Sequence, residues 1–164
     1  MKMRILLCLV SLTALLCGCM ASKESRYYLL EAEAPKTRAA VFLQRIDLPV
    51  YLEQNSLIRR VGRDRLEFIE GHSWVGSFRR LLENGISDGL ASGAKHGIAI
   101  KVRRFEAAND GRFHADLECS DGNEIRRIAY SLPCDSGNAA GIVSAYSNAL
   151  AELHRQLAEL YPAP

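Results

Sequence analysis

Alternating apolar and polar residues predict a three-stranded meander in the second half of the chain. Residues 98–103 alternate strictly, and residues 113–119 repeat the pattern after the turn signal Asn109-Asp110-Gly111. A third strand follows at 124–132, where the pattern slips around Arg126-Arg127 in a way that predicts a bulge. Pro133 then ends the predicted sheet.

Shorter apolar runs predict four more strands in the first half of the chain. These runs lie at residues 26–30, 39–48, 57–61 and 65–70. The last two flank the turn Gly62-Arg63-Asp64 and therefore predict a hairpin.

Apolar residues at helical spacing predict two helices. The first begins after Ser73, a candidate N-cap, and its stripe is Trp74, Phe78, Leu81, Leu82, Ile86 and Leu90. Gly85 and Gly89 mark either close packing or early fraying of its second half. The second is capped by Asp135 or Ser136, ends before Pro162, and carries Ile142, Val143, Tyr146, Leu150, Leu153, Leu157 and Leu160.

This order of elements predicts an α+β fold. A mixed, largely antiparallel sheet with both helices on one face buries both helical stripes economically. The sequence has no internal repeat and no second hydrophobic span. We therefore expect a single domain at residues 26–164.

The N-terminus has the layout of a secretory signal, with Lys2 and Arg4 before an apolar run from Ile5 to Leu16. The run leads into Leu16-Cys17-Gly18-Cys19, which resembles a bacterial lipobox. Residues 1–18 would then be a signal peptide, Cys19 the acylated first residue, and 19–25 a lipidated tether. An ordinary signal peptide with a chance cysteine and an uncleaved membrane helix are the alternatives, although the run is shorter than the about 20 residues of a span.

Removal of the signal changes the charge balance. Without Lys2 and Arg4, the 21 Lys and Arg residues fall to 19, equal to the 19 Asp and Glu residues. A net charge near zero gives no electrostatic case for nucleic-acid binding.

Two cysteines, Cys119 and Cys134, remain without lipid in a compartment where a disulfide is allowed. If they lie at distant points of the predicted meander, roughly 33 Å of strand separates them, whereas a disulfide needs Cα atoms within about 7 Å. We expect both thiols to be free unless the third strand bends back.

No catalytic or metal-binding constellation is visible in the sequence. The four histidines, His72, His96, His114 and His154, never form a His-x-His or His-x-x-x-His pair. Ser73 beside His72 lacks a Gly-x-Ser-x-Gly elbow, and no glycine-rich phosphate loop follows a strand. We therefore expect neither an enzyme nor a metal or cofactor site, and a hydrolase is the least favoured class.

Arginine is the one residue type that is unusually abundant. Arginines recur near acidic residues at Arg59-Arg60, Arg63, Arg65, Arg79-Arg80, Arg103-Arg104 and Arg126-Arg127. One interpretation is an interface that binds a partner's carboxylates or lipid headgroups. The other is an ordinary solvated face with weak ion pairs.

A series of short motifs lies between residues 48 and 84. They are Leu48-Pro49-Val50-Tyr51-Leu52, Leu57-Ile58-Arg59-Arg60, Arg65-Leu66, Glu70, Trp74 and Arg80-Leu81-Leu82-Glu83-Asn84. Together they resemble the signature of the PqiC-like (YmbA-like) family of ABC-type transport auxiliary lipoproteins. Val75-Gly76-Ser77 departs from the family pattern after the Trp.

The resemblance implies an outer-membrane lipoprotein, anchored in the bilayer through acylated Cys19, that faces the periplasm and docks onto an inner-membrane-anchored MCE-domain protein. Systems of this kind move phospholipid or other hydrophobic molecules between membranes. Met20, rather than Asp, follows the lipid cysteine, which favours the outer membrane. The resemblance also implies a fold akin to the N-terminal domain of TolB and a homo-oligomer.

The same resemblance makes Tyr51, Arg59, Arg60 and Trp74 candidates for the partner interface. The alternative is a periplasmic module that itself holds a lipid or small molecule in the groove between sheet and helices. The sequence does not identify the cargo, the contact surface or the oligomer size.

Overall fold

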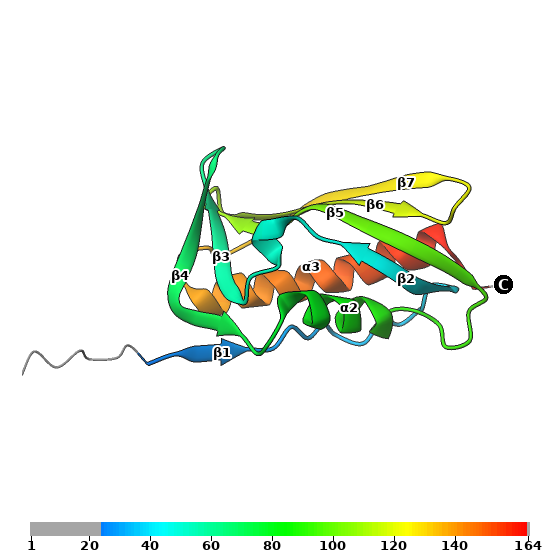
Figure 1. The fold of residues 1–164 in the computed structure, drawn as a ribbon, viewed down its shortest axis with the longest axis horizontal. Coiled ribbons are helices and arrows are strands. Elements are labelled where there is room, and N and C mark those ends of the chain that lie inside the picture. The colour runs from blue at the N-terminus through cyan, green and yellow to red at the C-terminus, as the bar shows by residue number, and fades with distance from the viewer. Residues whose placement is uncertain (1–23, 164) are drawn as a thin grey trace, which may run out of the picture.

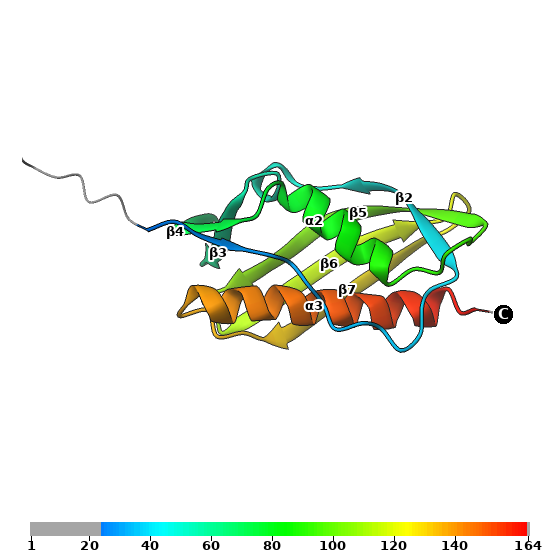
Figure 2. The ribbon, with the colours of Figure 1, turned by 90° about the horizontal axis from the view of Figure 1, so that it is seen from below.

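The computed structural model describes residues 24–163, which form a seven-stranded sheet with two helices on one face (Figure 1, Figure 2). The elements in chain order are β1 (Arg26–Tyr28), β2 (Val41–Asp47), the 3-10 helix η1 (Val50–Leu52), β3 (Ser56–Val61), β4 (Arg65–Trp74), α2 (Phe78–Asp88), β5 (His96–Ala108), β6 (Arg112–Ser120), β7 (Ile125–Pro133) and α3 (Ala139–Leu160). The sheet is mixed and mostly antiparallel. The predicted α+β class is therefore confirmed.

β5 is the central strand. Along one edge it pairs antiparallel with β6, which pairs antiparallel with β7. Two strands share its other edge: β2 pairs parallel with residues 96–101, and β3 pairs parallel with residues 107–108. The 3-10 helix η1 connects these two strands (Figure 1), and β4 and β1 extend the sheet beyond β3.

The irregularity in the meander lies in β5, not in β7. The β6–β7 ladder runs without a register shift, so the bulge predicted at Arg126-Arg127 is wrong. The pattern slips there because Arg126 occupies the helix-facing side of β7, where its Nη1 donates to the Leu160 carbonyl, 2.8 Å away. The observed shift lies between Val102 and Arg104.

The hairpin of β3 and β4 is confirmed, but β4 is longer than the sequence indicates. It continues to Trp74 because β1 pairs with its end, with Tyr28 opposite Trp74. Ser73 is therefore a strand residue, and its predicted role as the N-cap is wrong. The chain turns at Gly76, whose φ of +84° favours glycine, and α2 begins after Ser77, whose side chain makes no capping bond.

An aromatic cluster joins both helices to the sheet. Tyr146 of α3 stands edge-on to Trp74, Phe78, Phe105 and Phe113, with ring centroids 4.8 to 5.8 Å away. All five rings are at most 2 % exposed. Pairs of this geometry add about 0.5–1.5 kcal/mol each beyond the burial of apolar area.

The N-cap of α3 is Asn138, whose side chain accepts a 2.8 Å hydrogen bond from the Gly141 amide. The predicted caps, Asp135 and Ser136, are wrong. Asp135 instead accepts from the Gly137 amide and from the Asn138 side chain, so its carboxylate organises the turn that precedes the helix.

Gly85 and Gly89 of the first helix mark close packing. A Cβ at Gly85 would lie 2.5 Å from Leu150 Cδ2, and a Cβ at Gly89 would lie 2.2 Å from His154 Cδ2. The absence of side chains therefore lets α2 approach α3. Cys119 and Cys134, which we expected to be free, are unpaired and buried.

Candidate functional site

Tyr51 and Arg60 come together on the sheet face opposite the helices. Phe105 of β5 packs against Tyr146 of α3, so its neighbour Glu106 lies on the other face of the sheet. Arg60 of β3 reaches Glu106, and the Arg60 guanidinium lies 5.9 Å from the ring centroid of Tyr51 in η1. Three separate elements thus meet at one carboxylate.

Glu106 is fully buried and binds two arginines. One of its oxygens accepts from Arg60 Nε and from Arg104 Nε, the latter at 2.8 Å, and the other accepts from Arg60 Nη2 at 3.2 Å. Arg60 also donates from Nη1 to the Arg63 carbonyl. These bonds to Glu106 raise the pKa of Arg60. A buried carboxylate needs such partners because an unpaired buried charge is costly.

The Tyr51 hydroxyl is buried beside this network and makes no hydrogen bond within residues 24–163. Burial, and secondarily the charge of Glu106, raises the pKa of Tyr51 well above its ordinary value. Tyr51 is therefore a neutral phenol that covers the charged groups, and it is not poised as a base.

A second arginine holds η1 in place. Arg79 of α2 donates from Nε to Glu53 Oε2 at 3.1 Å and from Nη1 to the Ile46 carbonyl at 2.7 Å. The hydrogen bonds from Arg79 lower the pKa of Glu53. The segment that carries Tyr51 is thereby fixed to the helix layer.

The other two predicted interface residues lie elsewhere. Arg59 donates to the Ser136 carbonyl and to Glu67, at 2.5 and 2.6 Å, and so ties β3 to the loop before α3. Trp74 is 2 % exposed and packs in the aromatic cluster. The structure therefore groups Tyr51 with Arg60 and separates both from Arg59 and Trp74.

The sequence does not single out Glu106 and Arg104. Both occur among its recurring charged residues, but strict alternation from Ile98, Ile100 and Val102 would place Glu106 on the helix-facing side of the strand. The missing information is the register shift between Val102 and Arg104, which moves Glu106 to the opposite face, where Tyr51 of η1 lies beside its partner Arg60. Cys19, the predicted lipidation site, lies outside the described residues, as does most of the predicted tether.

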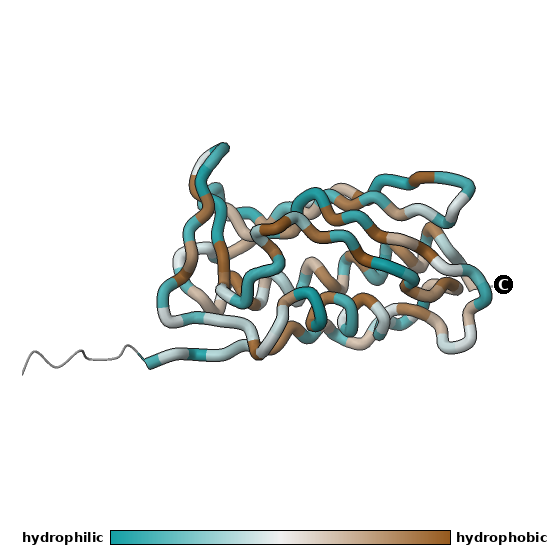
Figure 3. The backbone as a smooth tube through the Cα atoms, viewed as in Figure 1, coloured by the Kyte–Doolittle hydropathy of each residue, from teal (hydrophilic) through white to brown (hydrophobic). Residues whose placement is uncertain are grey.

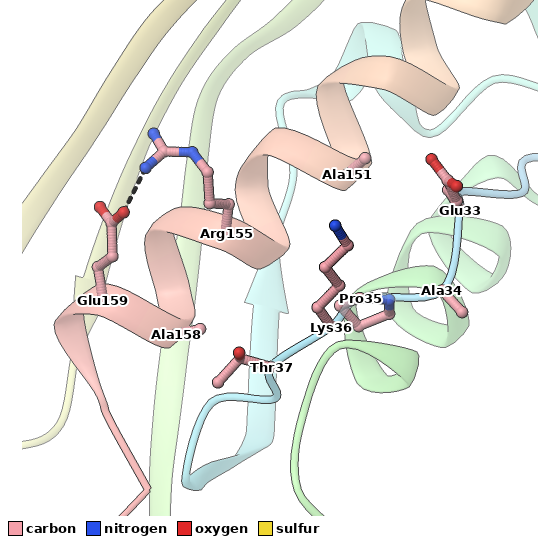
Figure 4. Close-up of a pocket in the computed structure, with 9 residues that line it drawn as sticks. All are labelled: Glu33, Ala34, Pro35, Lys36, Thr37, Ala151, Arg155, Ala158 and Glu159. Atoms are coloured by element: carbon pink, nitrogen blue, oxygen red, sulfur yellow. Dashed lines mark hydrogen bonds and ion pairs between the residues drawn. The ribbon is translucent and has the colours of Figure 1, made fainter.

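A different hollow lies on the outer side of α3 (Figure 4). It has a volume of about 570 Å³ and is lined by Glu33, Ala34, Pro35, Lys36, Thr37, Ala151, Arg155, Ala158 and Glu159. Arg155 is held by ion pairs to Glu152 and Glu159. The interface between sheet and helices, in contrast, is filled by buried side chains such as Tyr146, Leu150 and Leu153.

The part of the chain that the structure describes has no group of three His, Cys, Asp or Glu residues able to hold a metal ion. No helix within residues 24–163 is long and apolar enough to cross a membrane.

The arrangement around Glu106 can bind anions or a partner's charged groups, because its arginines carry permanent positive charge.

A family model for the ABC-type transport auxiliary lipoprotein component matches residues 28–158. The chain belongs to this family. The match begins at Tyr28, the last residue of β1, and ends two residues before the end of α3. The family is an auxiliary component of ABC-type transport and is not a known enzyme family. No curated protein matches the sequence significantly.

Two solved structures share the fold of this auxiliary component. One is described as an uncharacterized protein, with a TM-score of 0.66, 14% identity, and coverage of 84% of this chain and 99% of the other. The second is a Xanthomonas campestris protein of family DUF330, with a TM-score of 0.62, 16% identity, and coverage of 80% and 92%. At these identities the likeness concerns the fold alone.

Proposed function

We propose that this protein is an outer-membrane-anchored, periplasmic docking component of an MCE-type ABC transport system that moves phospholipid or other hydrophobic molecules between membranes. The observation that carries the proposal is the family match over residues 28–158. The lipobox-like Leu16-Cys17-Gly18-Cys19 supports a lipid anchor. Three acyl chains exceed the two signals that stable anchoring needs.

The proposal gives the domain a defined reach. Six residues lie between Cys19 and Arg26, the first residue of β1. An extended chain spans at most about 3.5 Å per residue, so the start of β1 stays within roughly 25 Å of the lipid anchor. The protein therefore acts by position at the membrane surface, with no reaction of its own.

Replacement of Cys19 tests the anchor. In the full chain, Cys19→Ala removes the acylated residue and should abolish mature, membrane-bound protein in fractionation on a density gradient. Cys8→Ala, inside the apolar run, is the matched control and should fractionate with the outer membrane. Unchanged fractionation of Cys19→Ala overturns the lipid anchor.

Docking is tested separately. The full lipoprotein, extracted in a mild detergent from cells that also produce the MCE-domain protein of the same system, should copurify with it. No association between the two intact proteins overturns the docking role.

The second candidate is a periplasmic module that binds a lipid or small molecule by itself. The hollow beside α3 in Figure 4 is the feature that favours it. Native mass spectrometry of the purified lipoprotein distinguishes the two, because a bound lipid within a monomer supports this second candidate.

A further inference from the structure

Four arginines line one hollow between β3, the turn that follows it, and β5. Arg60, Arg63, Arg103 and Arg104, with Gly62, surround a volume of about 410 Å³. Arg63 lies in the exposed turn at the hydrophilic tip of the β3–β4 hairpin (Figure 3).

The register shift in β5 is what brings two consecutive arginines to this hollow. Neighbouring residues of a regular strand point to opposite faces. The shift between Val102 and Arg104 interrupts that alternation, so that Arg103 and Arg104 both line the hollow. Bulges that redirect side chains in this way are enriched next to functional sites.

Buried Glu106 holds part of the cluster in a fixed arrangement. It binds Arg60 through Nε and Nη2, and it binds Arg104 through Nε alone. The two terminal nitrogens of Arg104 therefore have no hydrogen-bond partner within the described chain, and the Arg63 side chain has none either. A positioned guanidinium with unused donors is ready to bind an anion without losing further rotamer freedom.

The charge balance at the hollow is positive. Two carboxylates bond to three of the four arginines: Glu106 accepts from Arg60 and Arg104, and Glu118 accepts from Arg103 Nη2 at 2.5 Å. Asp110 and Asp116, which also lie close to Arg104, are engaged by His114 and Arg127. Asp64 lies next to Arg63 in the chain and makes no ion pair in the described residues.

We propose that the hollow bordered by Arg60, Arg63, Arg103 and Arg104 is a binding site for a phosphate group. Guanidinium forks match the oxygen geometry of phosphate and bind it through paired, charge-assisted hydrogen bonds. The phosphate comes from a phospholipid headgroup or from a soluble phosphate compound. The N-terminal end of β1 and the hairpin tip lie toward the same end of the molecule (Figure 1, Figure 2), so under the proposed function the hollow is near the anchored membrane surface.

The test uses the full lipoprotein in micelles of a non-ionic detergent. Inorganic phosphate is titrated into the protein by calorimetry, and saturable binding is expected. Arg63→Gln and Arg104→Gln should each weaken that binding about tenfold, the loss of one charge-assisted contact of about 1.4 kcal/mol. Arg45→Gln, which removes the same charge from an exposed residue of β2 outside the hollow, should bind as the unaltered protein does.

Absence of saturable binding, or equal weakening by Arg45→Gln, overturns the proposal. Arg63 is exposed and its side chain holds no other element in place, so Arg63→Gln remains informative if Arg104→Gln fails to fold. Competition by phosphatidylglycerol added to the micelles, with phosphatidylcholine as the control, identifies a lipid headgroup as the source. Phosphate binding without such competition identifies a soluble source. Neither result depends on the ABC partner, so failure of docking and failure of this site are distinguishable.

Discussion

Gly89, the C-cap of α2, lies against His154 of α3, and a Cβ at Gly89 would stand 2.2 Å from the imidazole Cδ2. The imidazole is fixed, because His154 is 2 % exposed and its Nε2 lies 2.8 Å from the Gly85 carbonyl. Gly89→Ala should therefore reduce the free energy of unfolding by about 1–3 kcal/mol, the usual effect of overpacking. Urea denaturation measures it.

Asn84→Ala is the matched control for that substitution. Asn84 is an exposed residue of the same helix, so alanine should change stability by less than about 0.5 kcal/mol. Equal stability of Gly89→Ala and Asn84→Ala would show that the helices can move apart freely.

Stability should also fall on mild acidification because of His154. Burial lowers the pKa of His154 below its ordinary value of 6.5, while the Gly85 carbonyl and Asp88 oppose that shift. The unfolded chain then binds this proton more tightly than the folded one, so the contribution is complete above about pH 6.5 and is lost as pH falls toward the lowered pKa. Urea midpoints at about pH 7.5 and pH 5 measure the loss.

His154→Gln removes the titrating group while keeping a side chain that can donate to the Gly85 carbonyl. Its stability should depend less on pH across the same interval. An identical pH dependence in both proteins would assign the effect to other groups.

Glu106→Gln should destabilise the domain by about 2–4 kcal/mol, because it leaves two guanidiniums without their buried counter-charge. Glu118→Gln removes the carboxylate that pairs with exposed Arg103, so it should cost less than about 1 kcal/mol. Chemical denaturation of both variants gives the comparison. Similar losses of unfolding free energy in Glu106→Gln and Glu118→Gln would mean that burial does not strengthen the ion pairs of Glu106.

Cys119 should react slowly with thiol reagents in the folded protein. Burial raises the pKa of its thiol to about 11, and the side chain is fully inaccessible, whereas the thiolate is the reactive form. Iodoacetamide labelling at neutral pH, followed by mass spectrometry, should modify Cys119 only after denaturant is added. Rapid labelling of the native protein would show that this part of the sheet opens readily.

The sequence predicted the helices and strands correctly wherever one face of a segment is solvated. β6 alternates because its outer side chains, among them Asp116 and Glu118, lie on the uncovered face of the sheet, and α3 shows its stripe because only one side packs. The predicted ends of helices and strands were wrong where a contact between residues far apart in the chain determines them. Trp74 stays in a strand because residues 46 positions earlier pair with it, and no local pattern around Ser73 carries that information.

The candidate site was harder to predict for a related reason. Tyr51 and Arg60 lie in short motifs that the sequence makes visible, but the buried carboxylate that binds Arg60 beside Tyr51 belongs to a strand about 50 residues further on. At Arg126 the sequence predicted a bulge that the structure does not have. A polar residue at a helix-facing position breaks the alternation in the same way as a bulge, and here that residue is an arginine that bonds to the end of α3. Side-chain partners far apart in the chain leave little trace in a hydropathy pattern.

The pairing of both β2 and β3 along one edge of β5 affects how the chain folds. Its partners β2 and β3 come from about 50 residues earlier, and its partner β6 follows directly. No contiguous stretch of the chain can complete this strand's hydrogen bonds, so nucleation must bring distant segments together and close a large loop first. The domain should consequently assemble slowly for its size and lose its structure in a single cooperative step, with no half of the sheet surviving alone.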